Sequence, residues 1–491
     1  MPIRFQNRYA ELPDVFRARV DPTPVADPEW VAFNRSLAEE LGLDANWLAG
    51  PDGLAMLSGN ARHRSSLPVA QAYAGHQFAN WVPRLGDGRA LLLGEVETPR
   101  GRLVDLQLKG SGPTPFSRGG DGRSSIGPAV REYLATETMA ALGIPTTRAL
   151  SVISTGEMVM RERPEPGGVM CRVASSHVRI GSFEYLARNG LGEQVQTLAD
   201  FIIDRHDPDL AGQADRYQRL FDRVVSRTMT LVAQWMSVGF VHGVMNTDNM
   251  ALSGETLDYG PFGFLDRFHP DTAFSYIDRR GRYAWGRQPT IAHWNLARLA
   301  ECLLPLFDAD PNRALEFANE RLQRIPREFD KAFHARLRAK IGLREASSGN
   351  DALALDLLDR MAGQEADMTL LFRALTDLDL EPGEADLKAR QWFRDPESFD
   401  LWARDWRQAL RAEGGDHAAR RQAMKQVNPA FILRNHLAQR VADAAVEDLD
   451  FAPLHEMLKV FARPYEDQPE HAHYQRPPKA EEVVANTFCG T

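Results

Sequence analysis

The sequence predicts an α+β protein with two lobes. Strand-like segments are concentrated between about residues 90 and 175, and long amphipathic helices follow from about residue 190. Of the 491 residues, 43% are hydrophobic and 25% are charged, which is ordinary for a chain that folds around a large core. Strands and helices that are segregated along a chain pack as separate units, so a cleft between the two lobes is the expected ligand site.

The composition argues against several classes of protein. Asp and Glu number 67 against 58 Lys and Arg, and the formal net charge of −9 disfavours nonspecific binding to nucleic acid. No run approaches the roughly 18 apolar residues of a membrane span, and the N-terminus lacks the apolar core of a signal peptide. We therefore expect a cytoplasmic protein with no nucleic-acid or membrane partner. Three scattered cysteines, Cys171, Cys302 and Cys489, are too few for a disulfide framework or a zinc site.

The strand-rich half contains one clear hairpin. Strands over residues 91–96 and 103–109 flank the turn Thr98-Pro99-Arg100-Gly101-Arg102. In the second strand Val104, Leu106 and Leu108 share one face, so Lys109 ends the strand on the opposite face. A helix over residues 128–142 follows, because Pro128 suits a first helical position and Gly143 ends the pattern.

The remaining elements suggest four parts. Further strands are expected over residues 149–154, 157–161 and 168–173, and long helices over 215–238, 291–304 and 313–341, the last broken near Pro326. The expected parts are a proline-rich N-terminal arm laid over the protein (1–70) with one helical stretch (30–43), an N-terminal lobe (71–185), a helical C-terminal lobe (186–462) and a mobile tail (463–491).

The most informative stretch lies between the two predicted lobes. A long helix ends at Gly239, a polar loop with His242 and Asn249 follows, and two short strands precede Asp258-Tyr259-Gly260. This order matches the catalytic loop and metal-binding triplet of a protein kinase, in which an Asn likewise follows the His by seven residues. Asn249 and Asp258 would then bind Mg²⁺ or Mn²⁺, because amide and carboxylate oxygens, completed by phosphates and water, suit such cations. An ordinary polar turn explains any one of these residues but not their order.

One position departs from the kinase pattern. The catalytic Asp of a kinase lies two residues after the His, where this chain has Val244. An apolar side chain can neither accept nor orient the proton of a hydroxyl group. The nearest carboxylate is that of Asp248, which becomes the expected proton acceptor.

The strand-rich half carries an altered phosphate site. Gly86 and Gly88 precede the first hairpin strand, where a kinase has its glycine-rich loop, but Leu91 replaces the third glycine. A tight turn is the simpler explanation until Lys109 is added, because a Lys on the next strand is the kinase arrangement. Lys109 would contact phosphates and pair with a Glu of the following helix. Periodicity does not choose between its two candidates, Glu132 and Glu137.

Two further features suit a polyphosphate. Residues 117–123 form a second glycine-rich segment, which kinases lack, and its backbone N–H groups can approach an anion, although a mobile surface loop is an equal alternative. Arg172 and Arg179 lie on and after a strand-like segment. Each alone is more often a solvated charge, but in a polyphosphate cleft they can act as bidentate donors.

Longer motifs spread over nearly the whole chain have a known counterpart. They are Tyr73-Ala74-Gly75-His76-Gln77-Phe78, Leu85-Gly86-Asp87-Gly88-Arg89, Leu108-Lys109-Gly110-Ser111-Gly112-Pro113, Gly119-Gly120-Asp121-Gly122-Arg123, Leu142-Gly143-Ile144-Pro145 and Asp258-Tyr259-Gly260-Pro261-Phe262-Gly263-Phe264. The likeness continues through Trp294-Asn295-Leu296 and Ile432-Leu433-Arg434-Asn435. In these motifs the chain resembles the selenoprotein O family, the YdiU-type proteins of bacteria.

The resemblance implies a kinase-like fold that transfers AMP from ATP to hydroxyl groups of proteins, with the nucleotide bound in the reverse sense to a kinase. Some members of the family use UTP as well. It implies that Asp248 is the proton acceptor and that Asn249 and Asp258 hold the metal. The residues implied to bind the nucleotide are Gly86, Gly88, Arg89, Lys109, Asp121, Gly122, Arg172, Arg179 and Asp258. Of the two glutamates, Glu132 is the one we favour as the partner of Lys109.

The reversed nucleotide has a physical rationale. When the α-phosphorus is attacked, pyrophosphate leaves, and its developing negative charge requires cationic donors that Lys109, Arg172 and Arg179 can supply. The carboxyl-terminal selenocysteine or cysteine of the family corresponds to Cys489. Some members have a second Cys soon after the metal-binding triplet, but this chain has none between residues 172 and 301. We therefore do not expect a regulatory disulfide of that kind.

Two other functions are compatible with these motifs. A kinase would transfer the γ-phosphoryl group, with Asp248 as a displaced base. A pseudokinase would bind ATP only to hold a partner-binding shape, but retention of both Asn249 and Asp258 speaks against it, because nucleotide binding alone does not require two metal ligands.

Overall fold

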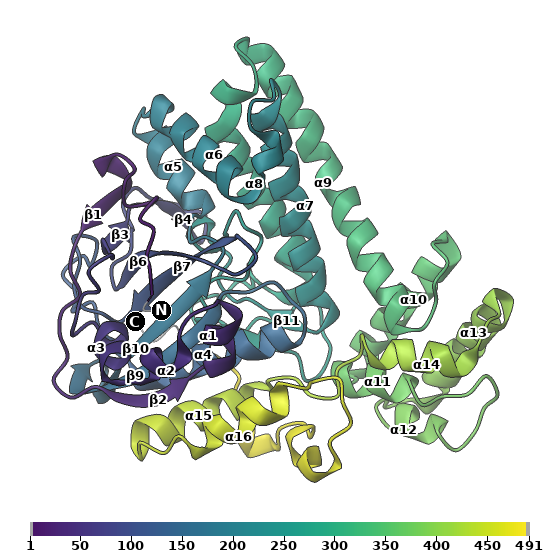
Figure 1. The fold of residues 1–491 in the computed structure, drawn as a ribbon. Coiled ribbons are helices and arrows are strands. Elements are labelled where there is room, and N and C mark those ends of the chain that lie inside the picture. Colours follow the sequence, from purple (N-terminus) through teal and green to yellow (C-terminus); the bar gives the residue numbers. More distant parts are fainter. Residues whose placement is uncertain (1–2, 488–491) are drawn as a thin grey trace.

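The structure is a computed structural model that describes residues 3–487. It confirms the predicted α+β class: the strands of the main sheet lie between Arg17 and Ala174, and from Ile180 onward the chain is mostly helical. Figure 1 shows the sheet on one side of the molecule and the long helices between residues 216 and 340 beside it. Among the described residues, no helix is both long enough and apolar enough to cross a membrane.

The main sheet is antiparallel, with strand order β1-β3-β6-β7-β10-β9-β2 and β8 paired to β10. Its strands are β1 (Arg17–Arg19), β2 (Glu29–Phe33), β3 (Val69–Gln71), β6 (Ala90–Glu97), β7 (Leu103–Lys109), β8 (Ser124–Ser125), β9 (Arg148–Met160) and β10 (Pro164–Ala174). The predicted hairpin is confirmed as β6 and β7, and Lys109 ends β7 opposite Ala90 and Met170 of its two neighbours. Residues 1–70, expected as a covering arm, also supply both edge strands of the sheet.

Helices cover both faces of this sheet. The short helices α1 (Arg35–Glu40), α2 (Ala45–Ala49) and α3 (Pro51–Ser58) pack against one face, where Leu106, Leu108 and Cys171 are buried. The helix α4 (Ile126–Ala141) packs on β9 and β10 from the other face and matches the prediction within two residues. Because alternate side chains of a strand point to opposite faces, the two helical layers remove most of β7 and β10 from water.

Three long helices form the centre of the second half. They are α7 (Arg216–Ser237), α8 (Gln288–Phe307) and α9 (Pro311–Lys340), and each contacts the other two. Between α7 and α8 the chain forms β11 (Phe240–Val241), the 3₁₀ turn η3 (Thr247–Asn249) and β12 (Gly263–Phe264), which carry the polar loop found in the sequence. The other helices of this half are α5 (Ile180–Arg188), α6 (Gly192–His206), α10 (Ser348–Gln364), α11 (Met368–Leu375), α12 (Asp386–Arg390), α13 (Pro396–Glu413) and α14 (His417–Lys425).

The C-terminal helices return to the sheet. In Figure 1, α15 (Asn435–Glu447) and α16 (Ala452–Phe461) lie beneath α4, and both contact it. Beyond them, in the region expected as a tail, the structure has the 3₁₀ turns η5 (Pro469–Tyr474) and η6 (Ala480–Glu482). Tyr474 is buried, and Thr487 forms a parallel bridge with Ser275. Cys489 lies outside the described residues.

The helix predicted over residues 30–43 is wrong in its first part. Residues Glu29–Phe33 form β2, which pairs with β9, and α1 begins only after Asn34, whose side chain accepts a hydrogen bond from Leu37 N at 3.1 Å. Aromatic and β-branched residues such as Trp30 and Val31 favour a pleated surface, and Asn is a preferred N-cap. The residues before Asn34 therefore favour a strand at the edge of the sheet, and the helix begins only after this N-cap.

Two interruptions that the sequence predicted, one between two strands and one within a helix, are absent from the structure. The segments 149–154 and 157–161 belong to one strand, β9. In α9 the helix continues through Pro326, which lies on the exposed side while Ile325 and Phe329 are buried. A proline costs a helix one hydrogen bond, but water can satisfy the freed carbonyl on an exposed face, and packing against α7 and α8 holds the helix together.

Candidate active site

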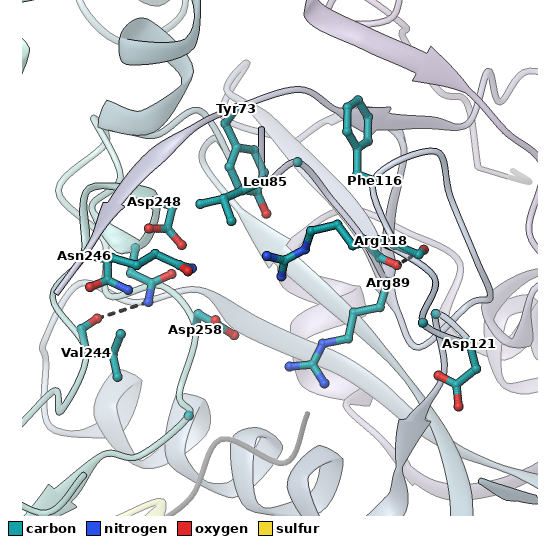
Figure 2. Close-up of a pocket in the computed structure, with 18 of the residues that line it drawn as sticks. Tyr73, Leu85, Arg89, Phe116, Arg118, Asp121, Val244, Asn246, Asp248 and Asp258 are labelled. Atoms are coloured by element: carbon teal, nitrogen blue, oxygen red, sulfur yellow. Dashed lines mark hydrogen bonds between the residues drawn. The ribbon is translucent and has the colours of Figure 1, made fainter. Parts of the chain in front are cut away.

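A cavity of about 700 Å³ lies where the strand-rich half meets the polar loop after α7. Figure 2 shows its two walls, with Arg89, Arg118 and Asp121 on one and Val244, Asn246, Asp248 and Asp258 on the other. The predicted site residues that line it are Gly86, Gly88, Arg89, Asp121, Gly122, Asp248, Asn249 and Asp258. Tertiary folding thus brings together residues that lie more than 150 positions apart in the sequence.

Beside the cavity, two cations and two carboxylates form a buried ion network. Lys109 Nζ lies 2.5 Å from Glu132 Oε2 and 3.0 Å from Asp258 Oδ1. Arg172 contacts the same two carboxylates, donating from Nε to Glu132 Oε1 at 2.7 Å and from Nη2 to Asp258 Oδ1 at 2.7 Å. The two positive charges of the network therefore balance its two negative charges. Charged side chains are buried at tolerable cost only when they are paired in this way.

Only one of the two candidate glutamates of α4 contacts Lys109. Glu132 is 1% exposed and contacts Lys109, as we favoured from the resemblance. Glu137 instead accepts hydrogen bonds from the Arg148 guanidinium and from the backbone N–H of Ala149, so it joins α4 to the start of β9. Residues five apart on an α-helix point in directions roughly 140° apart, so only one of the two can reach Lys109.

Asp258 is held in the ionised state. Burial alone would raise the pKa of its carboxyl group, but the charges of Lys109, Arg172 and Arg89 outweigh burial and hold the pKa well below its usual range. Its backbone has φ = 67°, in the left-handed region that a residue with a side chain rarely adopts. Such conformations persist where the surroundings over-determine them, which is common at functional sites.

Asp248 lies in a different environment within the same cavity. It belongs to η3 and is 8% exposed, and its Oδ1 has no hydrogen-bond partner among the described residues. Burial raises the pKa of Asp248 to about 6, against the opposing effects of Arg179 and of a hydrogen bond from Gln77. A carboxylate with a pKa close to neutral is well suited to accept a proton during a reaction.

The motif Tyr73–Phe78, to which the sequence analysis assigned no role, holds the polar loop around Asp248 in place. Its strand β4 (Gly75–Gln77) pairs with β5 (Asn80–Val82). The N–H of His76 donates to Thr247 Oγ1 at 2.8 Å, and the N–H of Phe78 donates to Asn246 Oδ1 at 3.0 Å. At Gly75 a Cβ atom would lie 2.6 Å from Asp248 Oδ1, so only glycine allows this close approach.

The donor set at the end of the loop fits a divalent cation. Asn249 Nδ2 donates to the carbonyl of Val244 at 3.1 Å, and the amide oxygen of Asn249, which has no hydrogen-bond partner within residues 3–487, remains beside the cavity. Asp258 uses Oδ1 for Lys109 and Arg172, so Oδ2 is the second available oxygen. In the part of the chain that the structure describes, no three His, Cys, Asp or Glu residues cluster as metal ligands. A cation at Asn249 and Asp258 would therefore take its remaining ligands from phosphates and water.

The predicted arginines Arg172 and Arg179 do not line the cavity themselves. Arg172 belongs to the ion network, and the Arg179 guanidinium lies 4.2 Å from the centre of the Tyr73 ring. Arg179 Nη1 donates to the carbonyl of Asp248 at 3.1 Å, whereas Nη2 is buried with no hydrogen-bond partner among the described residues. Arg179 thus lies directly behind Asp248, and its Nη2 is 3.8 Å from Oδ1 of the buried Asp87, an ion pair without a hydrogen bond.

Arg118 is a cavity residue that the sequence analysis did not single out. It is exposed and, with Arg89, extends from the strand-rich wall in Figure 2 towards the wall that carries Asp248 and Asp258. The available signal was its place in the second glycine-rich segment. Phe116, directly before that segment, packs closely on the Gly86 turn, because a Cβ atom at Gly86 would lie 2.3 Å from Phe116 Cγ.

Comparison with known proteins identifies the family. A family model described as "Protein adenylyltransferase SelO" matches residues 1–462. The chain belongs to the SelO family of protein adenylyltransferases. The resemblance seen in the sequence motifs is confirmed, and the SelO-family chain is an enzyme of the nucleotidyltransferase class.

Bacterial relatives match nearly the whole length. Each is named "Protein nucleotidyltransferase YdiU". The protein of Alkalilimnicola ehrlichii is 56% identical over 99% of this chain and 98% of its own length. Those of Methylorubrum extorquens and Bradyrhizobium diazoefficiens are 54% and 52% identical, each over 99% of both chains. The matched stretch therefore spans the part of the chain that forms the cavity.

Proposed function

We propose that this SelO-family protein transfers AMP from ATP to Ser, Thr or Tyr hydroxyl groups of other proteins and releases pyrophosphate. The observation that carries the proposal is the pair of carboxylates in one cavity. Asp258 is ionised by its buried cations, whereas burial raises the pKa of Asp248 to about 6. Two carboxyl groups in environments that move their pKa values apart are suited to different roles, here cation binding and proton acceptance.

In the proposed reaction the acceptor oxygen forms a bond to the α-phosphorus of ATP. The bond between this phosphorus and the oxygen that bridges to the β-phosphorus breaks, so pyrophosphate leaves with the electron pair. The hydroxyl proton passes to the carboxylate of Asp248, which lines the cavity. Val244 lines the cavity at the position where a kinase has its base, and it cannot take this role.

The cations around the cavity suit the leaving group. Arg89 and Arg118 line it. Arg179 lies behind Asp248 with a buried Nη2 that has no hydrogen bond among the described residues and only a 3.8 Å ion pair with Asp87. Charged donors directed at a leaving group stabilise the transition state in which its charge develops. Arg172 acts in this proposal through Asp258 and Glu132, which it already contacts, and reaches phosphate only by releasing one of them.

The proposal includes a metal ion and a nucleotide orientation. Asn249 and Asp258 hold Mg²⁺ or Mn²⁺, which when bound neutralises phosphate charge and helps to orient the nucleotide. The Lys109–Glu132 contact, between a strand of the antiparallel sheet and α4, supports a kinase-like fold, and we propose that the nucleotide binds to it in the reverse sense to a kinase. ATP is the proposed donor and UTP a second one, because contacts to phosphates do not distinguish the bases. The four-part division of the chain and a cytoplasmic location remain predictions.

Labelled ATP distinguishes the proposed adenylyltransferase from the kinase and pseudokinase alternatives. The protein is incubated with Mg²⁺ and with ATP labelled either at the α or at the γ position, and the label on protein and the released pyrophosphate are measured. We expect α label on protein, pyrophosphate in equal amount and no γ label. A γ label at a comparable rate would establish the kinase alternative. Nucleotide binding without transfer of either label would establish the pseudokinase.

A further inference from the structure

A second cavity, of about 500 Å³, lies in the helical half. It is bounded by the C-terminal ends of α4 and α7, by the last turns of α9 and by residues near Gln426 and Tyr465. It shares no lining residue with the candidate active site. Its size falls within the range of roughly 300 to 1,000 Å³ that is typical of small-molecule sites.

Two cations without counter-ions mark this cavity. Lys340 is 3% exposed, and among residues 3–487 its ammonium has no hydrogen bond and no ion pair, only the Phe372 ring with its centre at 4.4 Å. Arg336 lies one helical turn earlier on α9, is half-buried, and likewise has no hydrogen bond or ion pair among those residues. No residue that lines the cavity is Asp or Glu.

Two other buried cations among the described residues are paired with carboxylates. Arg434 contacts Asp266 and Asp367, and Arg407 Nη2 lies 2.6 Å from Asp386 Oδ1. An unpaired buried charge is costly, and such groups are normally neutralised by a partner or by a shift of their pKa. Burial, together with repulsion from Arg336, lowers the pKa of Lys340 to about 7, as expected for an ammonium group without a counter-ion.

The remaining lining of the cavity is amphipathic. Leu142, Ile144 and Val238 line it with the stem of Tyr465, whose hydroxyl donates to the carbonyl of Leu142 at 2.9 Å. We propose that this cavity binds a small organic anion, whose carboxylate or phosphate group is received by Lys340 and Arg336 and whose apolar body lies against these side chains. Charge-assisted hydrogen bonds of this kind are the strong ones, and the apolar wall adds burial of the ligand.

A purely structural explanation makes a different prediction. The face of the Phe372 ring and the carbonyl ends of α4 and α7 could by themselves compensate the positive charge. In that case no anion would be needed, and removal of either cation would leave anion binding unchanged. The two explanations therefore differ in a measurable affinity.

The test uses phenyl phosphate as an anionic probe with an apolar ring, and benzyl alcohol as its neutral counterpart. Isothermal titration of the full chain should give saturable binding of phenyl phosphate and at least about tenfold weaker binding of benzyl alcohol. Lys340→Met and Arg336→Gln should each weaken binding of phenyl phosphate by at least about tenfold. Lys331→Met and Arg327→Gln, which change exposed cations of the same helix, should leave it within about twofold.

Several results would overturn the proposal. They are the absence of saturable binding, equal affinity for the charged and the neutral probe, and equal affinity of the wild type and the Lys340 variant. Binding that persists in both cavity variants would report the nucleotide cavity instead. Circular dichroism and thermal unfolding of each variant establish that it is folded. The half-buried Arg336 provides a second variant that does not depend on replacing a core residue.

Discussion

Arg172 Nη2 lies 2.7 Å from Oδ1 of Asp258 and leaves the second oxygen of that carboxylate available. Lys109 donates to the same Oδ1 at 3.0 Å. One oxygen therefore fixes the charge and the orientation of the side chain, while the other remains for a cation. In this arrangement the network that buries Asp258 would also prepare it for the cation that we propose.

Replacement of Asp258 by Asn should abolish nucleotidyl transfer. The variant keeps the shape of the side chain but removes the charge, so Lys109 and Arg172 retain only Glu132 as an anionic partner. Transfer of α label to protein and the affinity for ATP with Mg²⁺ should both fall. Asp271→Asn, at an exposed position in the same part of the chain, is the control and should retain both. Normal turnover of the Asp258 variant would exclude a role in cation binding.

Replacement of Asp248 by Asn should affect the rate much more than binding. Loss of a positioned proton acceptor typically lowers the rate by about 10² to 10⁴. Because Asn is close in size, Arg179 can keep its hydrogen bond to the carbonyl of residue 248. Single-turnover rates and ATP titrations separate the two effects. A rate near that of the wild type would show that the proton goes elsewhere.

Neutralising the cations of the cavity should weaken ATP binding more than AMP binding. Arg89→Gln, Arg118→Gln and Arg179→Gln each remove a donor proposed for the β and γ phosphates, which AMP lacks. A charge-assisted contact contributes roughly 1.5 to 3 kcal/mol, or about one to two decades of affinity. Arg100→Gln, in the exposed turn between β6 and β7, is the matched control. Equal losses for ATP and AMP would place the arginine near the α-phosphate instead.

The cysteines should have little influence on the rate. Cys171 and Cys302 are buried, and burial raises the pKa of the Cys171 thiol to about 12, which disfavours the reactive thiolate. Deleting residues 488–491, which include Cys489, should leave transfer to an added protein within a few-fold, and mild oxidant should change it little. A large loss with oxidant that is absent from Cys489→Ser would contradict this expectation and indicate redox control through the tail.

Replacement of Lys340 by Met should stabilise the protein in a pH-dependent manner. The pKa of Lys340 is lowered to about 7 in the folded state, against roughly 10.4 in the unfolded chain. Between these values the unfolded state binds a proton that the folded state lacks, so this lysine costs stability as the pH falls from about 10 to 7. The gain from Met should be on the order of a few kcal/mol at pH 7 and should fade towards pH 10. Urea unfolding at several pH values, with Lys331→Met as control, measures it, and a gain independent of pH would contradict the shifted pKa.

Local patterns predicted most elements because their periodicity is a local property. The hairpin that ends at Lys109 and the helices α4, α7 and α8 follow from alternation, from the 3.6-residue period and from Pro and Gly at the ends. The segment near Trp30 was misassigned because its neighbour in the sheet, β9, lies more than 100 residues away in the sequence. The predicted break of the helix at Pro326 was wrong because the local sequence does not show that this side of α9 is exposed to water.

By itself, the sequence determined the α+β class and the family through its long motifs, and it proposed candidate residues for a cation, since these depend on residue type and spacing. Only the tertiary structure decided that Glu132 rather than Glu137 contacts Lys109, that Arg172 contacts Asp258, and that Gly75 lies against Asp248. It also decided that Lys340 is buried without a counter-ion among the described residues. The physical reason is that pairing and desolvation depend on distances between segments far apart in the chain, and these distances are set only when the sheet and the helices pack.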